Sequence, residues 1–166
     1  GTEEAILAFY RVQRVLKESI LWIVGREERR GYLKKLKSTV NKLHLNKKVR
    51  FFGYVSEREK FDLLKKAWVL IHPSAKEGWG LTVIEAGSCR TPTVAYNVSG
   101  LRDSIVNNKT GLLTDKNPTD LAEKILKLFS NRVLYDKLSR NAMIWSKKFD
   151  WENSTKISLD LIESIV

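Results

Sequence analysis

The sequence of 166 residues has few of the side chains that build disulfides and metal centres. It contains one cysteine, Cys89, and two isolated histidines, His44 and His72. A single cysteine excludes an internal disulfide and any zinc site with several cysteines, and isolated histidines without an Asp-x-Asp pair predict that no metal is bound. No apolar run approaches the roughly 18 residues that span a bilayer, and the N-terminus lacks a secretory signal pattern. We therefore expect a soluble protein of the cytoplasm.

Two phosphate-binding motifs are also missing. The sequence has no Gly-x-x-x-x-Gly-Lys-Ser/Thr run. The segment that begins at Gly78 lacks the third glycine of the dinucleotide fingerprint. The chain is therefore neither a P-loop nucleotidase nor a typical dinucleotide-binding protein.

Acidic residues are in the minority. There are 30 lysines and arginines against 19 aspartates and glutamates, which gives a formal net charge of +11, and 43% of the residues are hydrophobic, enough to build a core. The charge attracts a phosphate-bearing ligand, an acidic membrane surface or nucleic acid, and does not choose among them. Because Trp22, Phe52 and Trp68 fall inside expected strands, the aromatic residues predict core packing, and we expect no nucleic-acid partner.

Short apolar runs alternate with longer amphipathic stretches, which is typical of repeated β-α units and a parallel sheet. We expect a single α/β domain over residues 1–166, a Rossmann-like three-layer sandwich. Strands are predicted at residues 20–24, 49–52, 68–72, 93–96 and 111–114. Helices are predicted at residues 3–17, 28–43, 57–67 and 81–88, followed by three more near residues 118–129, 134–145 and 153–165.

The segment from His72 to Glu85 is the richest in candidate site residues. It passes from a strand through a loop with glycines into a helix. In open parallel sheets, ligands bind outside the carboxyl ends of the strands, where such loops lie. The free N–H groups at the start of a helix attract phosphate. Beside phosphates, Glu85 and Glu77 make sense if they meet the hydroxyl groups of a ribose and a sugar. The alternative stays open that Glu77 is a solvated loop residue and that Glu85 pairs with a basic side chain.

Four motifs in this order and spacing resemble the group 1 glycosyltransferases of family 4. The motifs are Phe-Gly-Tyr-Val-Ser at residues 52–56, Pro-Ser-Ala-Lys-Glu-Gly-Trp-Gly-Leu-Thr-Val-Ile-Glu-Ala at 73–86, Thr-Pro-Thr-Val-Ala at 91–95 and Thr-Gly-Leu-Leu at 110–113. The resemblance implies a retaining enzyme of the GT-B fold, in which two Rossmann-like domains face each other across a cleft. It covers nearly all of the C-terminal domain, which binds the nucleotide sugar.

The resemblance also implies a role for each matching residue. Glu85 binds the ribose of the donor, and Glu77 lies beside the donor sugar as the catalytic residue. Val55 neighbours the base, and Gly25 lines the same cleft. Backbone N–H groups of one stretch hold the sugar and the diphosphate: Gly78, Trp79, Gly80, Leu81 and Thr82. No cofactor or metal is implied, because the nucleotide diphosphate sugar is itself the donor substrate.

The chain departs from the family pattern at three places. Arg90 stands where the family usually has glycine, and Arg102-Asp103 stands where it often has Pro-Glu. The acceptor domain, the opening strand and the family's phosphate-neutralising Arg and Lys are expected before the first helix and are not in this sequence. We therefore expect the chain alone to be inactive.

The expected activity is transfer of a sugar, of hexosyltransferase type, to an acceptor hydroxyl of a glycan, a lipid-linked molecule or a small molecule. The positive charge suits peripheral contact with the inner face of a membrane. An alternative from another class is a non-catalytic module that binds a nucleotide or a sugar phosphate.

Overall fold

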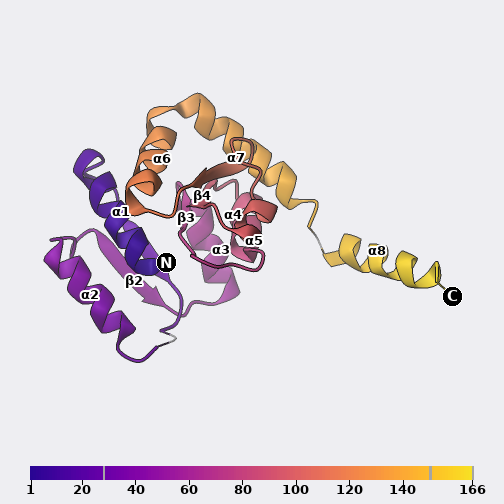
Figure 1. Cartoon of the computed structure of the whole chain (residues 1–166), viewed down its shortest axis with the longest axis horizontal. Coiled ribbons are helices and arrows are strands. Elements are labelled where there is room, and N and C mark those ends of the chain that lie inside the picture. The colour runs from indigo at the N-terminus through magenta and orange to yellow at the C-terminus, as the bar shows by residue number, and fades with distance from the viewer. Residues whose placement is uncertain (28, 150, 166) are drawn as a thin grey trace.

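The computed structural model describes residues 1–27, 29–149 and 151–165, and Figure 1 shows how helices and strands alternate along it. The strands are β1 (Leu21–Val24), β2 (Val49–Gly53), β3 (Leu70–His72), β4 (Thr93–Tyr96) and β5 (Gly111–Thr114). The helices are α1 (Thr2–Val15), α2 (Tyr32–Lys42), α3 (Glu57–Lys66), α4 (Leu81–Ser88), α5 (Ser99–Ser104), α6 (Pro118–Ser130), α7 (Arg132–Ser146) and α8 (Trp151–Glu163).

The five predicted strands and seven of these helices are confirmed, with ends shifted by a few residues. Residue 28, the predicted start of the second helix, lies outside the described residues. Helix α5 was not predicted. The prediction that Trp68 begins a strand and packs in the core is wrong: β3 starts at Leu70, and Trp68 is half exposed, with its ring stacked on Phe129 at 5.2 Å between centroids. The prediction of core packing is also wrong for Phe52, which lies in β2 but is 40% exposed.

Local sequence explains where several helices begin. Before α3, the Ser56 hydroxyl accepts a hydrogen bond from the N–H of Glu59, and the Glu59 carboxylate accepts one from the N–H of Ser56. Before α6, the Asn117 side chain accepts from the N–H of Asp120, and Pro118 occupies the first turn, where its missing N–H costs nothing. Such caps typically stabilise a helix by about 1 kcal/mol.

The sheet consists of two parallel parts with helices on both faces. β1 pairs with β2, and β3, β4 and β5 pair in that order. Helices α2, α1 and α6 contact one another in sequence on one face, while α3, α4 and α7 do so on the other. The predicted three-layer α/β architecture is therefore confirmed, but the hydrogen-bonded sheet is divided into a two-stranded part and a three-stranded part.

Helix α1 links the two parts of the sheet. On one side, Glu3 pairs with Lys35 of α2 at 2.6 Å, and on the other the carboxylate of Glu4 accepts a hydrogen bond from the hydroxyl of Tyr96 in β4. Between them, Ile6 and Phe9 are buried in the main core. Each such side chain contributes about 1.5–3 kcal/mol by leaving water.

Among the described residues, β1 and β3 each pair with a strand on one edge only. Gly1, just before α1, packs so tightly against the carbonyl of Pro73 that an added Cβ would lie 2.2 Å from that oxygen. The start of α1 therefore lies at the carboxyl end of β3, beside the division between the two parts of the sheet.

Helix α8 extends away from the rest of the molecule (Figure 1). Its apolar side chains Ile157, Leu161 and Ile162 are about 60% exposed. The end of the chain therefore adds little to the core described above.

Candidate functional site

The candidate site lies where β3 ends and α4 begins. Gly80, the residue before α4, has φ +83°, a left-handed conformation that suits glycine, and an added Cβ would lie 2.8 Å from the side chain of Leu101. Within the part of the chain that the structure describes, no side chain caps α4 at this residue. The first N–H groups of the helix, at Leu81 and Thr82, therefore stay available to an anion, and the helix dipole favours negative charge there.

Glu77 lies in the loop before α4 and is held in place by its neighbours. One carboxylate oxygen accepts a hydrogen bond from the N–H of Gly78 at 3.2 Å, and the other lies 3.6 Å from Nε2 of His72, at the end of β3. Burial lowers the pKa of His72 and outweighs the opposing effect of the Glu77 carboxylate, so the imidazole is neutral at pH 7. The side chain of Glu77 is 28% exposed, which is less than expected for a freely solvated loop residue.

The loop itself packs against a helix that the sequence did not predict. At Gly100, near the start of α5, an added Cβ would lie 2.3 Å from the carbonyl oxygen of Gly78 and 2.5 Å from that of Glu77. The ring of Trp79 packs edge-on against Phe149, with 5.1 Å between centroids. The side chain of Trp79 is therefore used for packing, and a ligand would meet the backbone of this residue. The side chain of Leu81, in contrast, is 64% exposed.

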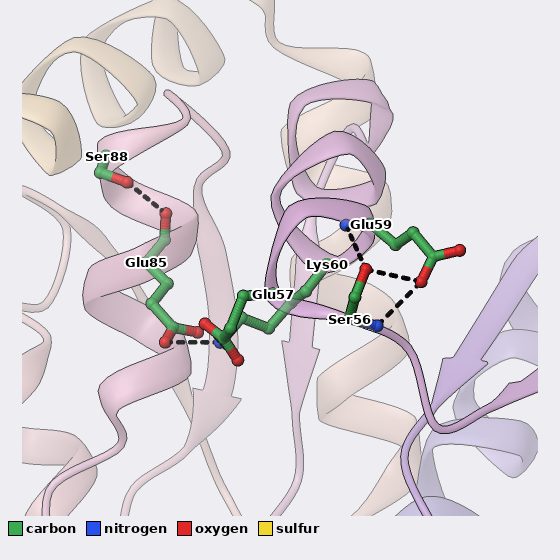
Figure 2. A network of polar contacts seen from close by, with 6 residues as sticks. All are labelled: Ser56, Glu57, Glu59, Lys60, Glu85 and Ser88. Carbon is green, nitrogen blue, oxygen red and sulfur yellow. Dashed lines mark hydrogen bonds and ion pairs between the residues drawn. The ribbon is translucent and has the colours of Figure 1, made fainter.

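Glu85 lies just past the first turn of α4 and faces α3 (Figure 2). Its Oε1 lies 2.8 Å from Nζ of Lys60, and Lys60 also pairs with Glu57 at 2.9 Å. The side chains of Glu85 and Lys60 are 26% and 24% exposed, whereas that of Glu57 is 80% exposed. The alternative that Glu85 pairs with a basic side chain is thus confirmed, and its side chain stays partly exposed.

The remaining predicted site residues lie at the ends of β1 and β2. The N–H of Gly25 donates to the carbonyl of Gly53 at 2.8 Å, so the two strand ends are neighbours. Next to them, the guanidinium of Arg26 lies 4.1 Å from the ring centroid of Tyr54, and Tyr54 is 67% exposed. Val55 follows, immediately before the cap of α3. Because Lys60 lies on α3, this helix connects the β2 end to Glu85.

Sequence reasoning assigned no role in the site to four residues of this neighbourhood: Arg26, Lys60, His72 and Gly100. Two of them had a usable signal. His72 opens the Pro-Ser motif, and Arg26 directly follows a strand-ending glycine. Lys60 had none, because its partner Glu85 is 25 residues away in the sequence.

The described residues hold no group of three or more His, Cys, Asp or Glu side chains arranged for a metal ion. None of the described helices combines the length and the apolar character needed to cross a bilayer.

Comparison with known proteins points to one family. The family model described as "Glycosyl transferases group 1" matches residues 1–145. A relative from Methanocaldococcus jannaschii, described as an uncharacterized glycosyltransferase, is 38% identical over 120 residues, which are 72% of this chain and 34% of the relative. The chain thus spans about a third of the length of this relative.

Solved structures share the fold. The Anabaena protein HepE, determined in complex with UDP and glucose, matches with a TM-score of 0.82 and 24% identity over 96% of this chain and 44% of HepE. Sucrose-phosphate synthase from Thermosynechococcus elongatus matches with a TM-score of 0.86 and 23% identity over 99% of this chain and 43% of the enzyme. The architecture is therefore that of GT-B glycosyltransferases.

Proposed function

The chain belongs to the group 1 glycosyltransferases, and from that premise we propose that it is the donor-binding part of an enzyme that transfers a sugar from a nucleoside diphosphate sugar to an acceptor hydroxyl. The observation that carries the proposal is the start of α4. There, a helix N-terminus that no described side chain caps follows a left-handed Gly80 and is flanked by two acidic residues with partly exposed side chains, Glu77 and Glu85. This combination suits a ligand that carries phosphates in the middle and hydroxyl groups at both ends.

Each part of the donor has a proposed partner. The N–H groups of Leu81 and Thr82 meet the diphosphate and stabilise the charge that develops as it departs. Glu85 accepts hydrogen bonds from the ribose hydroxyls, and Glu77, whose carboxylate is held by the N–H of Gly78, accepts them from the sugar. The base lies beside Val55. Since HepE was solved with UDP and glucose, UDP is a reasonable first probe.

We further propose that catalysis needs chain beyond this sequence. In the doubly wound order 3-2-1-4-5-6, the opening strand lies between the second and the fourth. Here β1 and β3 correspond to the second and fourth strands, and each has one edge that no described strand pairs with. An acceptor domain with the phosphate-neutralising Arg and Lys completes the cleft, and the reaction retains the anomeric configuration. The cytoplasmic location and the contact with an acidic membrane surface stay predictions from the sequence.

Calorimetric titration of UDP, GDP and ADP into the chain tests the proposal. We expect at least one to bind, and we expect Glu85→Gln to weaken that binding about 10-fold, because hydrogen bonds to a charged acceptor contribute about 1.5–3 kcal/mol and the amide keeps one acceptor oxygen. Glu123→Gln is the matched control, since Glu123 is exposed on α6 on the opposite face, and it should leave the affinity unchanged.

The same preparation, mixed with UDP-glucose, is expected to release no UDP above the uncatalysed background. Turnover by the chain alone would contradict the need for a second domain. Equal affinities of the Glu85→Gln and Glu123→Gln variants would remove Glu85 from the site. Binding without turnover in a longer form of the protein would favour the alternative of a non-catalytic module.

A further inference from the structure

Lys60 is the feature that the proposed function leaves without a role. It lies in the first turn of α3, and its Nζ bridges two carboxylates, at 2.8 Å from Glu85 and 2.9 Å from Glu57 (Figure 2). Its side chain is only 24% exposed. By contrast, Lys65 on the same helix is 64% exposed and pairs with Asp62 at 4.0 Å, which is the ordinary situation of a surface lysine.

The bridge connects two elements that approach the proposed ligand from different sides. Lys60 belongs to the helix that follows Val55, and Glu85 belongs to the helix whose N-terminus we assign to the diphosphate. The N-terminus of α3 is fixed by the reciprocal hydrogen bonds of Ser56 and Glu59. Lys60 is therefore presented to Glu85 from a well-defined helix start.

The proposed diphosphate repels the Glu85 carboxylate, and Lys60 can hold this carboxylate in place despite the repulsion. Glu85 must accept hydrogen bonds from hydroxyl groups while lying near phosphates of the same sign, and repulsion would turn away a carboxylate that nothing holds in place. A carboxylate has two oxygens with about four acceptor positions. Since Lys60 lies on Oε1, Oε2 keeps its acceptor positions for a vicinal diol.

We infer that Lys60 is a positioning residue, which holds the Glu85 carboxylate in the orientation that accepts the ribose hydroxyls. The inference rests on the proposed function, because it assigns Lys60 through the proposed role of Glu85. Glu57 also pairs with Lys60, from the solvent side. Because Glu57 is 80% exposed, its ion pair contributes less to holding Lys60 than the pair with Glu85 does.

The test compares a ribonucleotide with its sugar-modified analogue. The probe is whichever of UDP, GDP and ADP binds the unchanged chain tightest, together with its 2′,3′-dideoxy form. We expect Lys60→Met to weaken the ribonucleotide about 10-fold and the dideoxy form less than 2-fold, because the dideoxy form offers nothing to Glu85. Lys60→Arg, which keeps the charge, should recover most of the affinity, although the shape of guanidinium differs.

A matched control and a double variant separate positioning from general effects. Lys65→Met removes one positive charge from the same helix and should change neither affinity. Adding Lys60→Met to Glu85→Gln should cost less than 2-fold beyond Glu85→Gln alone, because the two residues act through one contact. Thermal unfolding checks that each variant is folded, and Lys60→Gln replaces Lys60→Met if the latter is not.

Each outcome decides one question. Equal weakening of the ribonucleotide and the dideoxy form by Lys60→Met, or no effect on either, overturns the role of Lys60 while leaving the proposed function intact. Failure of the unchanged chain to bind any of the three nucleotides, or to prefer the ribonucleotide over the dideoxy form, overturns the proposed function and this inference with it.

Discussion

The two parts of the sheet differ in charge and in burial. Residues 29–56, around α2 and β2, carry nine basic and no acidic residues, whereas the segment from β3 to β5 holds nearly equal numbers of both. The strands differ in the same way: all four residues of β4 are buried, but three of the five residues of β2 are exposed. The motif with Glu77 and Glu85 lies on the buried, nearly neutral part.

This difference predicts different roles for the two parts of the sheet within the proposed donor site. The three-stranded part holds the loop and α4 rigidly against a dense core, as a site with fixed N–H donors requires. The two-stranded part presents exposed groups at its strand ends, such as Tyr54 and Arg26, and most of the net positive charge. Most of the overall charge of +11 therefore lies on the surface beside the motif with Glu77 and Glu85, and not on the motif itself.

The largest expected effect comes from replacing one glycine in each part of the sheet and comparing the losses in unfolding free energy. Gly100→Ala would bring a Cβ within 2.3 Å of the Gly78 carbonyl, so the loop must move, and we expect a loss of about 3 kcal/mol in unfolding free energy together with loss of nucleotide binding. Gly25→Ala meets no atom of the described residues within 4 Å and suffers only from its φ of +137°, which we expect to cost about 1 kcal/mol. Denaturant unfolding of both variants measures the contrast.

A smaller effect tests how α1 couples the two parts. Tyr96→Phe removes the hydrogen bond from β4 to Glu4, and we expect it to lower the unfolding free energy by about 2 kcal/mol at pH 7, as for other hydrogen bonds to a charged acceptor. Unchanged stability would mean that the packing of Ile6 and Phe9 holds α1 without this contact.

The same pair gives a pH dependence of known sign. Burial, helped by the nearby Glu4, raises the pKa of Tyr96 above its usual value of 10.0. Above pH 10 the unfolded chain releases this proton while the folded chain keeps it, so stability falls as pH rises, by up to about 1.4 kcal/mol per pH unit. The advantage of the unchanged chain over Tyr96→Phe should therefore shrink between pH 10 and 11. A constant difference would contradict the raised pKa.

The sequence predicts regular elements and motif residues well, and contacts between distant segments poorly. The periodic apolar residues of α1 and α6 and the motif at 73–86 are local signals, and they place α4 and its glycines correctly. Helix α5 has only six residues, and the close approach of Gly100 to the loop depends on packing. Neither the Lys60–Glu85 pair nor the division of the sheet has a local signature, because each joins segments that meet only after folding.

The smallest expected effect on the unfolding free energy comes from Arg90, where the family pattern and the backbone conformation both favour glycine. The resemblance flags it as a departure from glycine, and its φ of +63° lies in the left-handed region that favours glycine. Its carbonyl accepts a hydrogen bond from Ser139 of α7 at 2.6 Å, which helps to hold the turn before β4.

Arg90→Gly should raise the unfolding free energy by about 0.5 kcal/mol, because relief of the left-handed conformation slightly exceeds the entropy that glycine adds to the unfolded chain. Arg90→Ala removes the same side chain and keeps a Cβ in the left-handed conformation, so it should bring no gain. Chemical unfolding at pH 7 compares the three chains. If alanine stabilised the protein as much as glycine, the cost would lie in the arginine side chain and not in the backbone, and the rigid three-stranded part would carry no conformational strain at this turn.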